Sequence, residues 1–176
     1  MGEYVRLVKP TAELRYEYLD FYQDWVDSGE DMVPWVISKD PSDFEAMVQS
    51  LFDNEKGENL PANRVPDSTY WLVTDQNKVV GAVNIRHRLS EKLLNCGGHI
   101  GYGIRPSERR RGYATQLLAL ALEKTKALGI ENVLVVCDDC NEASARTIIR
   151  NGGLQDVSFT EEDGNVVKRF WIRHHL

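Results

Sequence analysis

Cysteine, basic residues and long apolar runs are scarce in this chain, and each shortage excludes a class of protein. Three cysteines among 176 residues are an odd number and too few for a disulfide framework, which is consistent with a reducing compartment. The apolar runs are short, and the N-terminus MGEYVRLVKP has no hydrophobic signal core. We therefore expect a cytoplasmic protein that neither spans nor crosses a membrane.

Positive charge is also in short supply. Lysine and arginine total 21 against 27 aspartates and glutamates, so the formal net charge is -6. We expect no sequence-independent binding of nucleic acid or of anionic lipid. The length and the hydrophobic fraction of 42% suit one domain that covers residues 1–176, without repeats. The arginine run at 109–111 should therefore bind something small.

The apolar pattern predicts elements in the order β-α-α-β-β-β-α-β-α-β-β. Phe44, Met47 and Leu51 recur at helical spacing, whereas the run NVLVVC at 132–137 is typical of a strand covered on both faces. Asp40 is expected to cap the second helix, Leu128 is expected on the buried stripe of the third, and the stretch before Gly98 is expected to be irregular. The expected strands cover residues 4–8, 69–74, 78–88, 99–105, 132–137, 154–160 and 166–173, and the expected helices cover about 11–28, 41–56, 112–128 and 141–151.

The stretch IRPSERRRGYATQLLALAL, from Ile104 to Leu122, joins a strand to a helix through a tight turn. The first N–H groups of a helix have no partner within it and lie at the positive end of its dipole, so they bind anions. Gly112 lets a phosphate approach the backbone closely. Three arginines at a helix start oppose the dipole, which suggests an anionic ligand. The spacing excludes both the nucleotide P-loop and the dinucleotide fingerprint.

The pattern Arg109-x-x-Gly112-x-Ala114 resembles the pyrophosphate loop of the GNAT superfamily of N-acetyltransferases. The order of elements is that of the family, and NEASARTIIRNGG, from Asn141, is similar to its second signature helix. The resemblance covers essentially the whole chain. It implies an α/β (α+β) fold: a mixed, mostly antiparallel sheet of six to seven strands, with one splayed parallel pair and four main helices on both faces.

The resemblance also implies acetyl-CoA as the second substrate, held between strands 99–105 and 132–137. The diphosphate is expected on the N–H groups of 110–115, and the pantetheine arm along 102–105. The N–H of Ile104 would polarise the thioester carbonyl. Asn141 would contact the arm, although an N-cap role is equally compatible. The implied coenzyme-binding residues are Tyr102, Ile104, Arg109, Arg110, Arg111, Gly112, Tyr113, Ala114, Thr115, Asn141 and Ser144.

The implied reaction is direct attack of a neutral primary amine on the thioester, without a metal. The usual glutamate base is replaced by Gly98 and the usual tyrosine acid by Ile148. A thiolate is a fair leaving group without an acid, since thiols ionise near pH ~8.5. His87 and His99 are the candidate bases, because imidazole titrates in a suitable range. Ordered water is the alternative.

The segment DWVDSGEDMVPW is the expected wall of the acceptor site, since the loop between the first two helices has this role in the family. Asp27, Glu30 and Asp31 would attract a cationic amine, and Trp35 would form an apolar wall. A solvated loop without a binding role explains the same residues equally well.

Other functions stay open. Cys137-x-x-Cys140 has the spacing of a redox dithiol, but the flanking Trp and Gly-Pro of the thioredoxin family are absent, and a metal site would lack further nearby ligands. A catalytically weak GNAT domain that binds CoA as a sensor is the main alternative to an enzyme, and a nucleic-acid binder is the third. A homodimer is compatible with the sequence.

Overall fold

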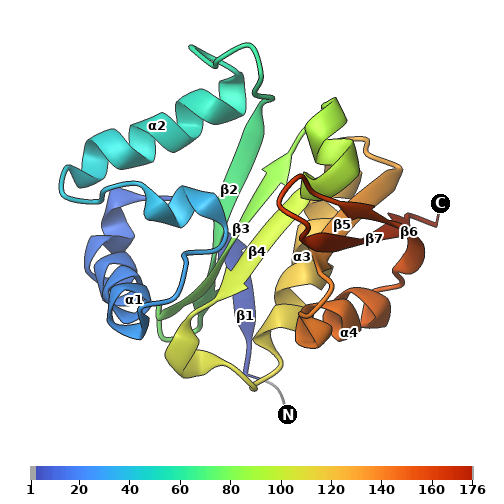
Figure 1. The fold of residues 1–176 in the computed structure, drawn as a ribbon. Coiled ribbons are helices and arrows are strands. Elements are labelled where there is room, and N and C mark those ends of the chain that lie inside the picture. Colours follow the sequence, from blue (N-terminus) through green and yellow to red (C-terminus); the bar gives the residue numbers. More distant parts are fainter. Residues whose placement is uncertain (1–2, 176) are drawn as a thin grey trace.

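The computed structural model describes residues 3–175 and shows the predicted order of elements (Figure 1). Its strands are β1 Val5–Val8, β2 Asp67–Thr74, β3 Val79–Arg86, β4 Ile100–Ile104, β5 Asn132–Asp138, β6 Leu154–Thr160 and β7 Val166–Arg173. Its main helices are α1 Arg15–Ser28, α2 Phe44–Lys56, α3 Tyr113–Ala127 and α4 Glu142–Arg150. Short helical turns are η1 Ala12–Leu14, η2 Trp35–Ser38, η3 Leu93–Gly97 and η4 Pro106–Glu108.

All seven strands form one sheet in the order β1-β2-β3-β4-β5-β7-β6. Neighbouring strands are antiparallel except β4 and β5, which run parallel and pair only at Ile100 and Val135. Beyond this pair the two strands diverge. The predicted splayed pair is thus confirmed, and it lies in the middle of the sheet.

Helices cover both faces of the sheet, with α1 and α2 on one and α3 and α4 on the other (Figure 1). The alternation of side chains along β2 explains this division, because Trp71 and Val73 pack with α1 and α2 while Leu72 packs with α3. Trp71 stacks on Tyr18 of α1, with 4.3 Å between ring centroids. No helix within residues 3–175 is long and apolar enough to cross a membrane.

Three local expectations were wrong. The cap of α2 is Asp43, whose side chain accepts from the N–H of Ala46, whereas Asp40 accepts from Ser42 in the preceding turn. The stretch before Gly98 forms the helical turn η3. The side chain of Leu128 is 45% exposed, because α3 ends at Ala127 and the buried stripe stops with it.

Arg105 follows β4 and fastens α1 to the end of this strand. Its Nε donates to Asp24 Oδ2 at 2.6 Å and its Nη2 donates to Asp20 Oδ2 at 2.7 Å. The hydroxyl of Ser107 also donates to Asp24. Burial raises the pKa of Asp24, but the hydrogen bonds from Ser107 and Arg105 outweigh it, so the pKa lies below its usual value. This group holds α1 and the segment after it against β4.

Candidate active site

Side chains cap α2 and α4 but not α3. Asp43 and Asn141 each accept a hydrogen bond from a backbone N–H in the first turn of their helix, at 3.1 Å. The N-cap of α3 is Gly112, with φ of 80°, and no side chain caps it. A Cβ on Gly112 would meet no atom within 4 Å, so backbone conformation rather than crowding explains the glycine. The first N–H groups of α3 are therefore available to an anion.

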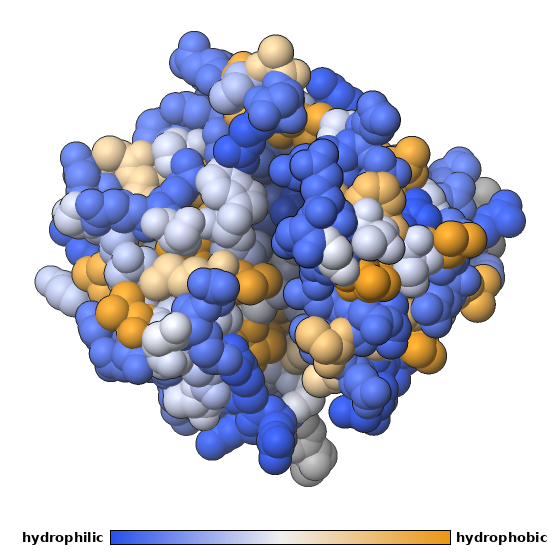
Figure 2. Space-filling model, viewed as in Figure 1, coloured by the Kyte–Doolittle hydropathy of each residue, from blue (hydrophilic) through white to orange (hydrophobic). Residues whose placement is uncertain are grey.

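The start of α3 opens on a cleft of about 900 Å³. Figure 2 shows the molecule hollowed between the half built on α1 and α2 and the half built on β5 and α4. The walls of the cleft come from α1 and the segment after it, from β4, from the loop before α3 and from α4. The predicted coenzyme-binding residues that line it are Tyr102, Ile104, Arg109, Arg110, Gly112, Tyr113, Ala114, Thr115, Asn141 and Ser144.

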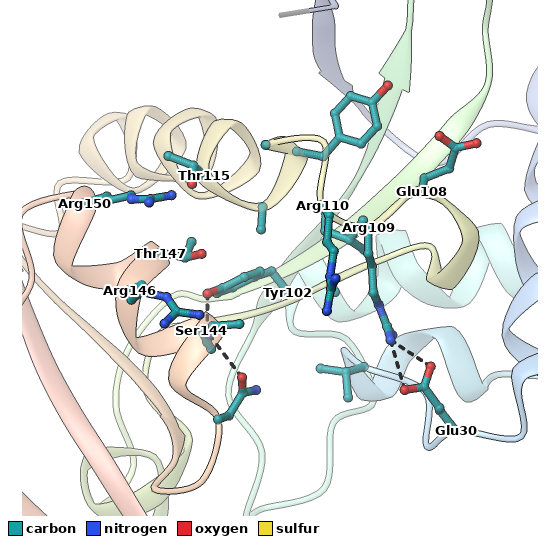
Figure 3. Close-up of a pocket in the computed structure, with 18 of the residues that line it drawn as sticks. Glu30, Tyr102, Glu108, Arg109, Arg110, Thr115, Ser144, Arg146, Thr147 and Arg150 are labelled. Atoms are coloured by element: carbon teal, nitrogen blue, oxygen red, sulfur yellow. Dashed lines mark hydrogen bonds and ion pairs between the residues drawn. The ribbon is translucent and has the colours of Figure 1, made fainter.

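The three arginines of the loop have different surroundings. Arg109 pairs with Glu30 at 2.9 Å, and its guanidinium lies 5.3 Å from the ring centroid of Trp25 (Figure 3). Arg111 pairs with Glu108 at 3.3 Å and does not line the cleft. Arg110, at φ of 64°, lines the cleft and makes no ion pair among residues 3–175. The run of arginines is thus partly neutralised by the protein, and Arg110 carries the charge left for a ligand.

The backbone of β4 presents hydrogen-bonding groups to the cleft. The N–H of Arg105 donates to the carbonyl of Val80, and Gly101 and Gly103 are register partners of Asn84 and Ala82, so the odd-numbered residues from 101 to 105 bond to β3. Backbone groups alternate sides along a strand, so those of Tyr102 and Ile104 face the gap towards β5. This geometry supports a strand-like pairing with an extended ligand and the role predicted for the N–H of Ile104.

The start of α4 forms the opposite wall. Asn141 caps this helix, and the hydroxyl of Ser144 lies 2.9 Å from that of Tyr102, which reaches across from β4 (Figure 3). Burial raises the pKa of Tyr102 to about 12, so it is a neutral hydrogen-bonding group at neutral pH. Arg146 and Arg150 also line the cleft, and sequence reasoning missed them. Their spacing of one helical turn was the available signal.

His99 joins β4 to β5 at the closed end of the splay. Its N–H donates to the carbonyl of Leu134 at 2.7 Å, and its Nδ1 accepts from the N–H of Leu134 at 2.9 Å. A neutral ring that accepts at Nδ1 carries its proton on Nε2. Burial, together with the nearby charge of Arg86, lowers the pKa of His99 to about 4. His99 is therefore neutral at neutral pH, with its lone pair already engaged.

His87 also lies outside the lining of the cleft. Its Nε2 is 2.8 Å from the hydroxyl of Ser68, and burial is the main cause of its lowered pKa. The two positions that lack the usual family catalysts have structural reasons. A Cβ on Gly98 would lie 2.6 Å from the carbonyl oxygen of Leu134, and the side chain of Ile148 is fully buried in the core.

The acidic segment after α1 does not form one rim. Glu30 and Asp31 line the cleft, and Glu30 is held by Arg109. Asp27 is exposed and accepts from the side chain of Gln23. Trp35 begins η2 and lies outside this lining.

The cysteines show no feature of a redox pair or a metal site. Cys137 is buried at the end of β5, and burial raises the pKa of its thiol, whereas Cys140 is exposed. Within residues 3–175, no group of three or more His, Cys, Asp or Glu side chains is placed to hold a metal ion.

A sheet splayed between two parallel strands, with an uncapped helix start beside the splay, suits a ligand that carries an anionic group and an extended arm. The sequence profile of the Acetyltransferase (GNAT) domain matches residues 5–153. The chain belongs to this family, which indicates an acyltransferase that uses acetyl-CoA. No curated protein sequence matches the chain significantly.

Solved structures with this fold cover nearly the whole chain. The microcin C7 self-immunity acetyltransferase MccE, solved with acetyl-CoA and AMP, is 15% identical with a TM-score of 0.68, over 99% of this chain and 94% of that one. A putative ribosomal-protein-serine acetyltransferase from Vibrio cholerae is 17% identical with a TM-score of 0.65, over 99% and 96%. A mutant form of the spermidine N-acetyltransferase SpeG from Vibrio cholerae is 15% identical with a TM-score of 0.63, over 97% and 94%.

Proposed function

We propose that this protein transfers the acetyl group of acetyl-CoA to a primary amine of a small molecule or peptide. The uncapped start of α3, open to the cleft between β4 and α4, is the observation that carries the proposal. Its free N–H groups and the side chain of Arg110 suit a diphosphate. The residues present thus fit the coenzyme, which supplies the activated acetyl group.

The residues of this chain contribute binding and polarisation. The backbone of Tyr102 and Ile104 pairs with the amide groups of the pantetheine arm, as an added strand does. The N–H of Ile104 donates to the thioester carbonyl, where negative charge develops during attack. Tyr102 and Ser144 hold the start of α4 against β4 across the cleft.

The attacking amine must lose a proton, because an alkylammonium group ionises near pH ~10.4. We propose that water relays this proton to solvent. The engaged Nδ1 of His99 and the position of His87 outside the cleft support a relay over the predicted histidine base. The departing thiolate needs no side-chain acid, consistent with Ile148 at the position of the family tyrosine.

The experiment combines calorimetry with CoA and a panel of amines, amino acids, polyamines, aminoglycosides and peptide N-termini, with thiol release as the readout. Binding of CoA in the micromolar range and turnover of at least one amine are expected. A protein that binds CoA but turns over no amine would instead be the CoA sensor, which the absence of both family catalysts favours. Failure to bind CoA would contradict both.

We also propose a cytoplasmic protein that associates with itself. One solved neighbour, a spermidine N-acetyltransferase from Vibrio cholerae, is described as dodecameric, with a TM-score of 0.62 and 15% identity. Light scattering coupled to size-exclusion chromatography tests this, and a mass of one chain would contradict it.

A further inference from the structure

A group of polar side chains lies on the α1 and α2 face of the sheet, where β2 begins and β3 ends. Asn84 donates to Asp67 Oδ1 at 2.8 Å and to Thr69 Oγ1 at 3.3 Å. These three residues are each no more than 3% exposed. The Oδ1 of Asn84 is buried and accepts no hydrogen bond within residues 3–175. Polar groups at such depth are usually satisfied, so this cluster is unlike ordinary core.

The guanidinium of Arg86, the last residue of β3, lies over β4 beside this cluster. Asn84 and Gly101 are register partners on the two strands. A Cβ on Gly101 would lie 3.1 Å from Nη2 and 3.2 Å from Nη1 of Arg86. Gly101 therefore gives the guanidinium room against the backbone of β4, in the same layer as Asn84.

Gly103, the next glycine on this face of β4, is covered by a backbone segment and not by a guanidinium group. A Cβ on Gly103 would lie 1.9 Å from the carbonyl oxygen of Val33, in the segment between α1 and η2. Tyr102, between the two glycines, presents its backbone to the coenzyme cleft. An acceptor that reaches β4 from the α1 and α2 side therefore meets this segment at Gly103 and the charge of Arg86 at Gly101.

The carboxylate of Asp67, the register partner of Arg86 on β2, only partly balances this charge. Arg86 Nη1 donates to the carbonyl of Gly97 at 3.3 Å, and Arg86 forms no ion pair within residues 3–175. Asp67 is already engaged by Asn84 through Oδ1, and its Oδ2 lies 3.7 Å from Arg64 Nη2. Burial, and the charge of Arg64, lower the pKa of Arg86, while Asp67 opposes this. Two guanidinium groups thus share one carboxylate.

Trp35 extends the same surface. The guanidinium of Arg64 lies 3.9 Å from the centroid of its ring, and Lys39 Nζ lies 5.5 Å from it. Arg64, Lys39 and Arg86 all keep part of their surface exposed. The part of the predicted wall around Trp35 therefore carries cations, although it was expected to receive a cationic amine.

We propose that Arg86 and Arg64 bind a carboxylate of the acceptor, so that the acceptor is an amino acid or a close analogue whose attacking amine lies near its carboxylate. This inference rests on the proposed acetyl transfer. Guanidinium groups bind carboxylates in planar, bidentate geometry, which selects them over other anions. A polyamine lacks the carboxylate and is repelled by the three cations.

The experiment compares matched acceptors. Initial rates of thiol release are measured for a set of amino acids, for the carboxamides of the same amino acids, for phosphoethanolamine and for spermidine. The kcat/KM of the preferred amino acid should exceed that of its carboxamide by about 30-fold or more, the effect of losing a charged hydrogen-bonded pair.

Variants assign the effect to Arg86. In Arg86→Gln the kcat/KM for the amino acid should fall by about 30-fold or more, while that for the carboxamide changes by less than about 3-fold. The kcat/KM of Arg86→Lys for the amino acid should lie between those of wild type and Arg86→Gln, because an ammonium group cannot bind in the bidentate manner. The matched control is Arg88→Gln, which removes the same charge from an exposed position two residues along the chain. The KM for acetyl-CoA should stay unchanged in all variants.

Two outcomes overturn the inference and leave the proposed function intact. One is wild-type turnover of carboxamides, phosphoethanolamine or spermidine as fast as of any amino acid. The other is an equal loss on both acceptors in Arg86→Gln. If that variant does not fold, the wild-type ratio still decides. Turnover of no acceptor, with CoA bound, would overturn the proposed function itself.

Discussion

The two sides of β4 are built in different ways. On the coenzyme side, residues 102–115 supply most of the wall in one continuous segment, and α4 completes it. On the acceptor side, Arg64, Asp67, Asn84 and Arg86 come from the ends of two strands and the loop before them, and meet at Gly101. The first side uses backbone N–H groups and the second uses charged side chains. A sequence motif therefore identifies the coenzyme and not the acceptor.

The two sides also differ in charge balance. Glu30 and Glu108 pair with arginines of the coenzyme loop, so the acids near the cleft are largely engaged. On the acceptor side, Arg64, Lys39 and Arg86 outnumber the single carboxylate of Asp67. The acidic segment that predicts a cationic acceptor in the sequence thus serves partly as a partner for the loop.

The largest expected effect concerns Arg105, which holds α1 against the end of β4 and so affects both sides of this strand. Arg105→Met removes the charged partner of the mostly buried carboxylate of Asp24, so the free energy of unfolding should fall by about 3 kcal/mol. Denaturant unfolding measures this. Arg109→Met, which removes an exposed pair, is the control and should cost less than about 1 kcal/mol.

The loss of unfolding free energy in Arg105→Met should depend on pH, because Asp24 is titratable. A carboxyl whose pKa is lowered by folding stabilises the protein above its unfolded pKa of ~3.9, and this stability is lost as the pH falls through the native pKa. The difference between wild type and Arg105→Met should therefore shrink at acid pH. A difference that does not change with pH would show that the ion pair is not its cause.

The coenzyme side is tested separately by Gly112→Ala. A left-handed alanine should cost about 1 kcal/mol of stability, and its methyl group should weaken CoA binding by about 30-fold. Gly129→Ala is the matched control, since Gly129 has φ of 76° and open space around it but lies at the far end of α3. Scanning calorimetry should show an equal loss of stability in the two variants. Titration calorimetry should show weaker CoA binding in Gly112→Ala alone.

A smaller effect distinguishes the arginines of the loop. Arg110→Gln should weaken CoA binding by about 10-fold, because Arg110 lines the cleft without an ion pair in the described part of the chain. Arg111→Gln should change the affinity by less than about 2-fold, because Glu108 already engages Arg111. Equal losses would mean that net charge, rather than position, attracts the coenzyme.

The smallest effect is expected in the pH-rate profiles of the histidine variants. His99→Ala should lower stability by about 1–3 kcal/mol, because the N–H of Leu134 loses its acceptor. The basic limb of kcat/KM should nevertheless keep its apparent pKa in His99→Ala and in His87→Ala. A shifted or lost limb in either variant would restore that histidine as the base.

Most of the fold follows from local patterns. The bounds of β6 and β7 agree with the prediction, and α1 and α2 end at Ser28 and Lys56, as predicted. The errors arise where several local signals compete. Asp40 and Asp43 both suit a helix cap, and the cap in the structure is Asp43, directly before Phe44, which packs on Trp71.

The candidate site, like the fold, has a part that local sequence predicts and a part that it does not. The anion-binding start of α3 could be predicted because a glycine, a helix dipole and unpartnered N–H groups are properties of one short segment. The roles of the charged residues could not, since the sequence does not show that Arg109 pairs with Glu30 or that His99 gives its lone pair to Leu134. These contacts join residues far apart in the chain.

The sequence by itself determined the family, the coenzyme loop and the order of elements, because each depends on backbone geometry that neighbouring residues control. Only the tertiary structure decided what faces the acceptor. Strand pairing brings Arg86 over Gly101 and leaves it to share the carboxylate of Asp67 with Arg64, and no pattern along the chain records that balance of charge.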